Sequence, residues 1–214
     1  MWSSEVTNMI ITGIWETLYM TLVSTLVGYV IGLPMGILLT VTDKDGIHPN
    51  TAVYKVLDVI ANLIRSVPFL ILLIVLIPFT RFLIGRSYGP TATIVPLVIA
   101  AAPYIARMVE SSLKEVDAGV IEAARSMGAS NFTIVTKVML VEARTSLIVG
   151  ATISLGTILG YSAMAGTVGG GGLGDIAIRY GYTRWQTDIM IVTVILLVIL
   201  FQIFQTIGMK LASN

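Results

Sequence analysis

Residues 17–42 read TLYMTLVSTLVGYVIGLPMGILLTVT and contain no charged side chain. A helix needs about 20 mostly apolar residues to cross the roughly 30 Å hydrocarbon core of a bilayer, and this stretch supplies 26. Three further uncharged runs of 20, 30 and 21 residues occupy 87–106, 145–174 and 189–209. Each run is long enough to be a membrane span, so lipid is the expected solvent of the fold.

A fifth apolar run is shorter, because only 15 residues separate Arg65 from Arg81. At 1.5 Å per residue they cover about 22 Å, so this span must begin near Tyr54 and carry Arg65 within it. The sequence therefore predicts an all-α polytopic membrane protein with one domain, 1–214, and five transmembrane helices. The predicted spans are 12–42, 54–84, 90–113, 140–166 and 187–210.

The composition supports this class and excludes several others. Hydrophobic residues make up 56% of the chain and charged residues 12%, with a mean hydropathy of +0.91, whereas a soluble domain carries about a quarter charged residues. The net charge of +1 gives no basic field for nucleic acid. Cysteine is absent and His48 is the only histidine, so no metal site is expected and an intramembrane enzyme is poorly supplied with catalytic groups.

The basic residues predict the orientation of the spans. Lys and Arg are enriched on the cytoplasmic side of membrane proteins. With the N-terminus outside and the C-terminus inside, nine of the thirteen basic residues lie on or toward the inner side and four outside. The inner connection 107–144 is then the longest, and it contains the most informative motif.

The segment DAGVIEAARSMG at 117–128 predicts a short inner helix with both ends marked. Asp117 is suited to capping the first free amides, and Gly128 to the left-handed residue that follows a helix. Val120, Ala124 and Met127 recur at helical spacing and predict one small apolar stripe. Ser130 or Asn131 then caps a second helix, NFTIVTKVML. From the residues alone, an interfacial helix pair and a docking element are equally supported.

A family resemblance separates these two readings. The EAA triplet at 122–124, Gly128 four residues later, Val138 and Leu140 resemble the EAA signature of binding-protein-dependent ABC importer permeases, with Val141 where that pattern has proline. The resemblance implies a coupling helix that docks in a cleft of an ATPase subunit. The residues assigned to ATPase coupling on this basis are Asp117, Val120, Glu122, Ala123, Ala124, Met127 and Gly128.

A second resemblance extends over nearly the whole chain. WETLYMTLVS at 15–24, RSVPFLILL at 65–73, PYIARMVESSL at 103–113 and GYSAMAGTVGGGGLG at 160–174 are similar to methionine-uptake permeases. This implies a multi-pass subunit of the bacterial inner membrane that translocates methionine, D-methionine or derivatives by alternating access. The implied partners are a second copy of the chain, two ATPase subunits and a periplasmic or lipoprotein substrate-binding protein. ATP and Mg²⁺ would bind to the ATPase, and no cofactor to this chain.

Two alternatives to this function stay open. One is an importer permease for another small amino acid or solute, because selectivity in such systems rests largely with the binding protein. The other is a gradient-driven secondary transporter, which usually shows mid-membrane acids or a repeat of broken helices. Neither a mid-span acid nor such a repeat is present in the sequence.

Glycines and small residues within the spans suggest close packing and a pathway. Gly28, Gly32 and Gly36 form two successive GxxxG units on the first span, and Gly156 and Gly160 repeat the spacing on the fourth. Tyr161, Ser162 and Met164 are candidates for a translocation gate, although Met and Tyr in membrane helices more often pack.

The glycine run after the fourth span matches GxGxxG at Gly169, Gly171 and Gly174 but lacks the strand and helix of a dinucleotide site. It predicts either a flexible or close-packed outer loop or a plain tight turn.

The polar side chains near or inside spans need partners. Asp58 is too far along the helix to pair directly with Arg65, so we expect Arg65 to reach the inner headgroups or to bind carbonyls freed near Pro68. Glu16 is expected to stay hydrated. Gln202 and Gln205 are expected to form interhelical hydrogen bonds.

Overall fold

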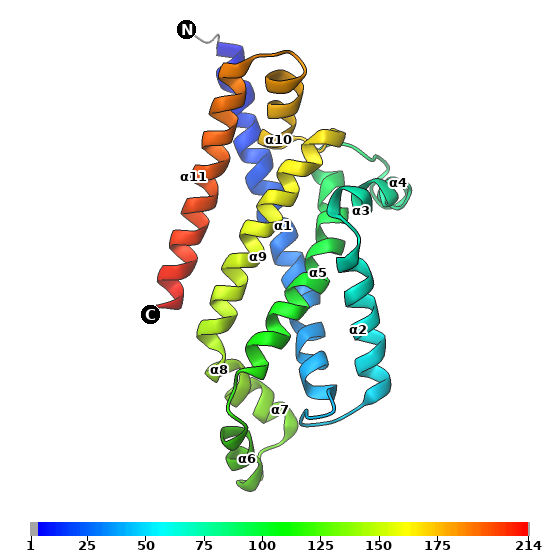
Figure 1. Cartoon of the computed structure of the whole chain (residues 1–214), viewed down its shortest axis with the longest axis vertical. Coiled ribbons are helices and arrows are strands. Elements are labelled where there is room, and N and C mark those ends of the chain that lie inside the picture. The colour runs from blue at the N-terminus through cyan, green and yellow to red at the C-terminus, as the bar shows by residue number, and fades with distance from the viewer. Residues whose placement is uncertain (1–3, 214) are drawn as a thin grey trace.

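The computed structural model describes residues 4–213, and every regular element in that range is helical (Figure 1). The elements are α1 Ser4–Thr42, α2 Thr51–Ser66, α3 Phe69–Val75, α4 Ile77–Ile84, α5 Pro90–Lys114, α6 Ala118–Ser126, α7 Asn131–Thr133, η1 Ile134–Met139, α8 Leu140–Glu142, α9 Arg144–Ala165, η2 Gly166–Val168, α10 Gly172–Ile176, η3 Ala177–Tyr182 and α11 Thr187–Ala212. Here η2 is a 3₁₀ turn, and η1 and η3 are π-helical.

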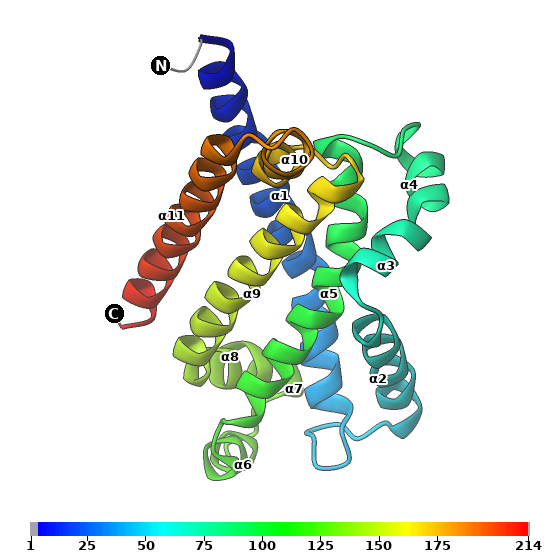
Figure 2. The same cartoon turned by 45° about the horizontal axis from the view of Figure 1, so that its top comes forward.

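Four helices of the described chain are long and apolar enough to cross a membrane: α1, α5, α9 with η2, and α11. A fifth span exists only if α2 and α3 together form one broken crossing. The all-α class predicted from the sequence is confirmed. Figure 2 shows α11 along one edge of the molecule and α2, α3 and α4 along the other, with α1, α5 and α9 between them.

The span predicted over 54–84 is not one continuous helix, because the chain bends by 101° between α2 and α3. Val67 adopts an extended conformation (φ −84°, ψ 126°), as expected for a residue before proline. Pro68 has no N–H to continue the α2 hydrogen-bond ladder. A second break at Leu76 separates α3 from α4.

The most extensive helix pair is α1 with α5. Gly28, Gly32 and Gly36 form the contact stripe on α1, and all three are buried. A methyl group added at Gly32 or Gly36 would lie 2.6 or 2.5 Å from a carbonyl oxygen of α5, closer than van der Waals contact allows. The backbones of the two helices approach this closely only because these positions lack a side chain.

Helix α2 is attached to the bundle mainly by charge. Ala61 is the one buried residue among its sixteen. Asp58 pairs with Arg107 on α5, and Arg107 also binds Glu110 at 2.6 Å. Lys114 continues the series with contacts of 2.8 Å to Glu110 and 2.7 Å to Asp43. We call these five residues the ion-pair chain; it links α2, α5 and the loop after α1.

The helix predicted for NFTIVTKVML is irregular. Ser130 caps it by accepting from the Thr133 N–H at 3.2 Å, and the chain then passes from α7 through the π-helical η1 to α8. The turn into α9 forms at Ala143, although Val141 replaces the proline of the family pattern. Proline is therefore not required for this turn.

Candidate functional site

The segment 117–128 forms a short capped helix, α6, at the end of the molecule opposite the N-terminus (Figure 1). Asp117 Oδ1 accepts a hydrogen bond from the Gly119 N–H at 2.7 Å. Gly128 has φ +80°, a left-handed conformation that side chains with a Cβ rarely adopt. Both ends of the helix therefore lie where the sequence predicts them.

The apolar stripe expected on α6 is not a single face. Ala124 is buried, at 4% exposure, and Ile121 packs beside the core with it. Val120 is 40% exposed and Met127, just past the helix, is 82% exposed. Because α6 is short and Met127 lies in the turn that ends it, the i+7 position rotates away from Ala124. Phe132, at the start of the next helical segment, is also uncovered at 76% exposure.

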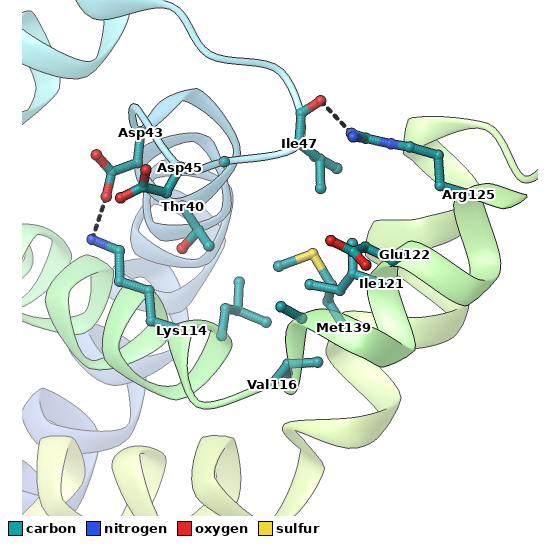
Figure 3. A pocket seen from close by; sticks show the side chains of 13 residues that line it. Thr40, Asp43, Asp45, Ile47, Lys114, Val116, Ile121, Glu122, Arg125 and Met139 are labelled. Atoms are coloured by element: carbon teal, nitrogen blue, oxygen red, sulfur yellow. Dashed lines mark hydrogen bonds and ion pairs between the residues drawn. The ribbon is translucent and has the colours of Figure 1, made fainter.

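A cavity of about 500 Å³ lies between α6 and the loop that joins α1 to α2 (Figure 3). Arg125 spans the gap by donating to the Ile47 carbonyl at 2.9 Å. Glu122 lines the same cavity. The Lys114 ammonium donates to Asp43 at 2.7 Å, and this hydrogen bond lowers the pKa of the Asp43 carboxyl. The loop that joins α1 to α2, α5 and α6 thus all contribute polar groups to this cavity.

A second, smaller cavity of about 180 Å³ lies where α2 breaks from α3. Tyr161 on α9 stacks on Phe69 of α3, with ring centroids 4.4 Å apart and planes at 5°. Arg65 and Tyr104 line the cavity with this aromatic pair. We call it the aromatic cavity.

The three gate candidates have different surroundings in the described chain. Of Tyr161, Ser162 and Met164, only Tyr161 lines the aromatic cavity. Ser162 is buried, donates to the Leu159 carbonyl at 2.7 Å and lies 3.5 Å from the Thr21 hydroxyl of α1. Met164 is half exposed. Consecutive helix positions point about 100° apart, so Ser162 faces α1 while Tyr161 faces α3.

The glycine run forms a closely packed loop. Gly169, Gly171 and Gly172 have positive φ. Glu16 Oε2 accepts from the Gly172 N–H at 2.7 Å, a partner that the sequence did not predict, while its side chain stays partly exposed. Gly174 lies directly against the Ala163 backbone. The loop is thereby fastened to the N-terminal half of α1.

Some of the other contacts expected from the sequence are present in the structure and others are not. Gly156 packs against Phe201 of α11, but Gly160 has no neighbour within 4 Å among residues 4–213, so it packs against no other helix of the described chain. Gln202 and Gln205 are exposed and form no hydrogen bond within residues 4–213. Arg65 likewise binds no carbonyl near Pro68.

The sequence reading missed the ion-pair chain. Asp58 was considered only as a partner for Arg65, whereas the structure joins it to Arg107, 49 positions away. A local signal existed: Arg107, Glu110 and Lys114 are spaced i, i+3 and i+7, which places them on one face of a helix.

Residues 28–210 match the family model described as the binding-protein-dependent transport system inner membrane component. The chain belongs to this family. It is therefore a multi-pass inner-membrane protein and a permease subunit of the ABC transporter family.

Similar proteins within this family cover almost the entire chain. The probable D-methionine transport system permease protein MetI of Vibrio cholerae is 47% identical over 97% of this chain and 92% of its own. The methionine import system permease protein MetP of Bacillus subtilis is 47% identical over 97% and 96%. A chain of the inward-facing MetNI methionine ABC transporter matches with TM-score 0.97 and 48% identity, covering 99% of this chain and 98% of that one.

A solved structure of lower sequence identity shares the architecture. An amino acid ABC transporter with histidines matches with TM-score 0.80 at 22% identity. Its similarity establishes a common fold.

Proposed function

We propose that this chain is the membrane-spanning permease subunit of an ATP-driven importer for methionine, including D-methionine and derivatives. The observation that carries the proposal is the full-length similarity to methionine permeases of Vibrio cholerae and Bacillus subtilis, with 97% of the chain covered in both cases. The fold agrees throughout with the permease chain of the MetNI transporter.

The proposed mechanism is alternating access in a homodimer. Two ATPase subunits bind ATP and Mg²⁺, and this chain binds neither. Their closure moves α6 of each copy, and the helices repack to open the route on the other side. A substrate-binding protein delivers methionine at the opposite face.

The proposed orientation places the N-terminus outside and α6 in the cytoplasm. The positive-inside bias supports it, since nine of thirteen basic residues then lie on or toward the inner side. These are Lys44, Lys55, Arg65, Arg107, Lys114, Arg125, Lys137, Arg144 and Lys210.

The proposed ATPase contact is the patch of Val120, Met127 and Phe132. Exposed apolar side chains on and beside a short helix at the end of the molecule are suited to docking against a partner subunit. Asp117 and Gly128 fix the helix ends, and Ala124 anchors it to the body of the permease.

Reconstitution with the ATPase and the binding protein tests the function. We expect vesicles to take up labelled methionine only when ATP, ATPase and binding protein are all present. Uptake driven by an ion gradient without the ATPase would replace this proposal with a secondary transporter. ATP-dependent uptake of a different solute would leave the importer but exclude methionine.

Substitution of the exposed patch tests the docking surface. Met127→Glu places a charge in the interface without disturbing the core, so the ATPase should no longer co-purify. Trp185→Glu is the matched control: Trp185 is 84% exposed, in the loop that leads into α11 toward the N-terminal end of the molecule (Figure 1). Equal retention of the ATPase by both variants would exclude α6 as its contact.

A further inference from the structure

Arg65 is a cation with no partner in the folded subunit. It forms no hydrogen bond or ion pair with any residue from 4 to 213. Asp58, the acid on the same helix, is occupied by Arg107 and Asn62. A cation in a membrane-spanning region is costly, and such residues mark the paths of substrates or ions.

The depth of Arg65 is set by the residues that line the aromatic cavity with it. Ala100 lies ten residues after the start of α5 at Pro90, and Tyr104 lies ten residues before its end at Lys114. At 1.5 Å per residue, each is about 15 Å from the nearer end of the helix. An extended arginine side chain reaches about half that distance. Arg65 therefore lies too deep to reach a headgroup without distorting the bilayer.

The cavity offers further recognition groups beside the cation. The Tyr104 hydroxyl lies 3.4 Å from that of Thr157, whose single proton is directed at the Ile153 carbonyl at 2.9 Å. Tyr104 donates no side-chain hydrogen bond to any residue from 4 to 213, so its O–H can turn toward a bound solute. The stacked pair of Phe69 and Tyr161 presents aromatic surface, which attracts both thioether sulfur and ammonium groups. A guanidinium and a phenol bind a carboxylate well.

The volume of the aromatic cavity suits a small solute. About 180 Å³ corresponds to roughly six waters of liquid volume, the scale of one amino acid of nine non-hydrogen atoms such as methionine. A phospholipid could offer an anion only if its phosphate were drawn to this depth.

We propose that Arg65 and Tyr104 bind the α-carboxylate of the transported amino acid, and that Phe69 and Tyr161 receive its side chain, in a transient site halfway across the membrane. This inference rests on the proposed function. It gives the permease a selectivity of its own: a solute without a carboxylate passes poorly even if the binding protein delivers it.

Photolabelling of the intact complex tests the site. The complex of permease, ATPase and binding protein is placed in lipid nanodiscs with a diazirine analogue of methionine and irradiated. We expect label on peptides containing Phe69 or Tyr161. Excess methionine should suppress it, whereas methioninamide, which lacks the carboxylate, should not.

Substitutions of Arg65 and Tyr104 test the two proposed carboxylate contacts individually. Arg65→Gln should reduce labelling about tenfold, the loss of one charge-assisted hydrogen bond, while Arg65→Lys retains part of it. Tyr104→Phe should reduce it less. Arg81→Gln is the matched control, because Arg81 lies on α4 outside the cavity. Equal labelling of wild type and Arg65→Gln would overturn the inference, as would label confined to other helices.

Two further measurements distinguish a bound lipid from a bound substrate, and failure of this site from failure of the proposed function. If Arg65 binds a lipid phosphate, Arg65→Gln should remove a phosphatidylglycerol seen by native mass spectrometry and leave the label unchanged, which would also overturn the inference. Vesicle uptake of methionine by the wild type is measured in parallel. Uptake without labelling at this cavity rejects only the site, whereas absence of uptake rejects the proposed function.

Discussion

Gly36 allows α1 to lie directly on the backbone of α5. A methyl group there would approach the Ala106 carbonyl oxygen to 2.5 Å. We expect Gly36→Ala to destabilise the subunit by about 1–3 kcal/mol, the usual cost of overpacking. Thermal unfolding in detergent, followed by tryptophan fluorescence, measures the change.

Gly160→Ala is the control for this prediction, because it makes the same substitution on a membrane helix with nothing within 4 Å. It should be neutral or slightly stabilising, since alanine is the better helix former. Equal destabilisation by the two variants would show that helix propensity, and not contact with α5, determines the role of Gly36.

Asp43 makes stability depend on pH in a defined direction. The hydrogen bond from Lys114 holds the pKa of Asp43 below its usual value, so the folded state favours the carboxylate. This stabilisation is present above the unfolded pKa of about 3.9 and is lost as pH falls through the lower folded value. The melting temperature of wild type should therefore approach that of Asp43→Asn in acid. A constant difference between them from pH 7 to pH 3 would contradict the linkage.

Single residues differed in how well the sequence predicted them. Asp117, Gly128 and the Gly28–Gly36 stripe were placed correctly, because capping and GxxxG packing depend on neighbours along one helix. The partners of Glu16 and Asp58 were not predicted, because they lie 156 and 49 positions away. Local spacing carries no information about which distant backbone or charge a side chain meets.

At the scale of an element, α2 depends on the ion-pair chain for its position. Glu110 is 6% exposed at its side chain and is held by Arg107 and Lys114. Arg107→Gln leaves both Asp58 and Glu110 without their shared partner. We expect a loss on the order of 3 kcal/mol, as for a buried pair deprived of one member, together with faster proteolysis near α2.

The control for the ion-pair chain is Asp45→Asn. Asp45 pairs with Lys44 at 3.7 Å, but both side chains are more than 80% exposed. Exposed pairs contribute about 0–1 kcal/mol, so this variant should melt close to wild type. A similar loss in both variants would mean that burial does not govern the strength of these pairs.

The break between α2 and α3 shows a limit of counting uncharged residues. The count correctly required helix before Arg65, and α2 does begin at Thr51. It could not reveal the 101° bend, because the number of uncharged residues says nothing about the direction in which the helix runs. Pro68 was the available signal, since the residue before proline avoids the helical region. Sequence alone does not settle whether a proline kinks a helix or ends it, because surrounding helices decide that.

At the scale of the whole molecule, the exposed edge of α2 and α3 is expected to face the second copy, because Arg65 lies on this edge and cannot face lipid. The chain has no cysteine, so single-cysteine variants report one position each. Leu63→Cys on α2, 66% exposed, should give crosslinked dimers with a short bismaleimide.

Val30→Cys serves as the control for the crosslink. Val30 is 68% exposed on α1. The Val30→Cys variant should remain monomeric under the same conditions. Dimers from Val30→Cys and none from Leu63→Cys would reverse the expected faces of the subunit.

The spacing of charged residues predicted the overall architecture, because every transmembrane helix must be long enough to cross the hydrocarbon core of the bilayer. The terminal spans, α1 and α11, were found in this way, with ends at Thr42 and Ala212 close to those expected. The aromatic cavity was not found. It is assembled from four separate helices, and Tyr161 was its one lining residue among the predicted gate candidates.

Helix α2 joins two features that are otherwise remote. Asp58 and Arg65 are seven residues apart on this rigid rod, about 10 Å along its axis, with the hinge at Val67 just beyond Arg65. Asp58 is held by Arg107, and Arg65 lines the aromatic cavity on the same helix. We therefore expect any rotation of α2 about Val67 to change the ion pair at Asp58 and the position of the Arg65 guanidinium together.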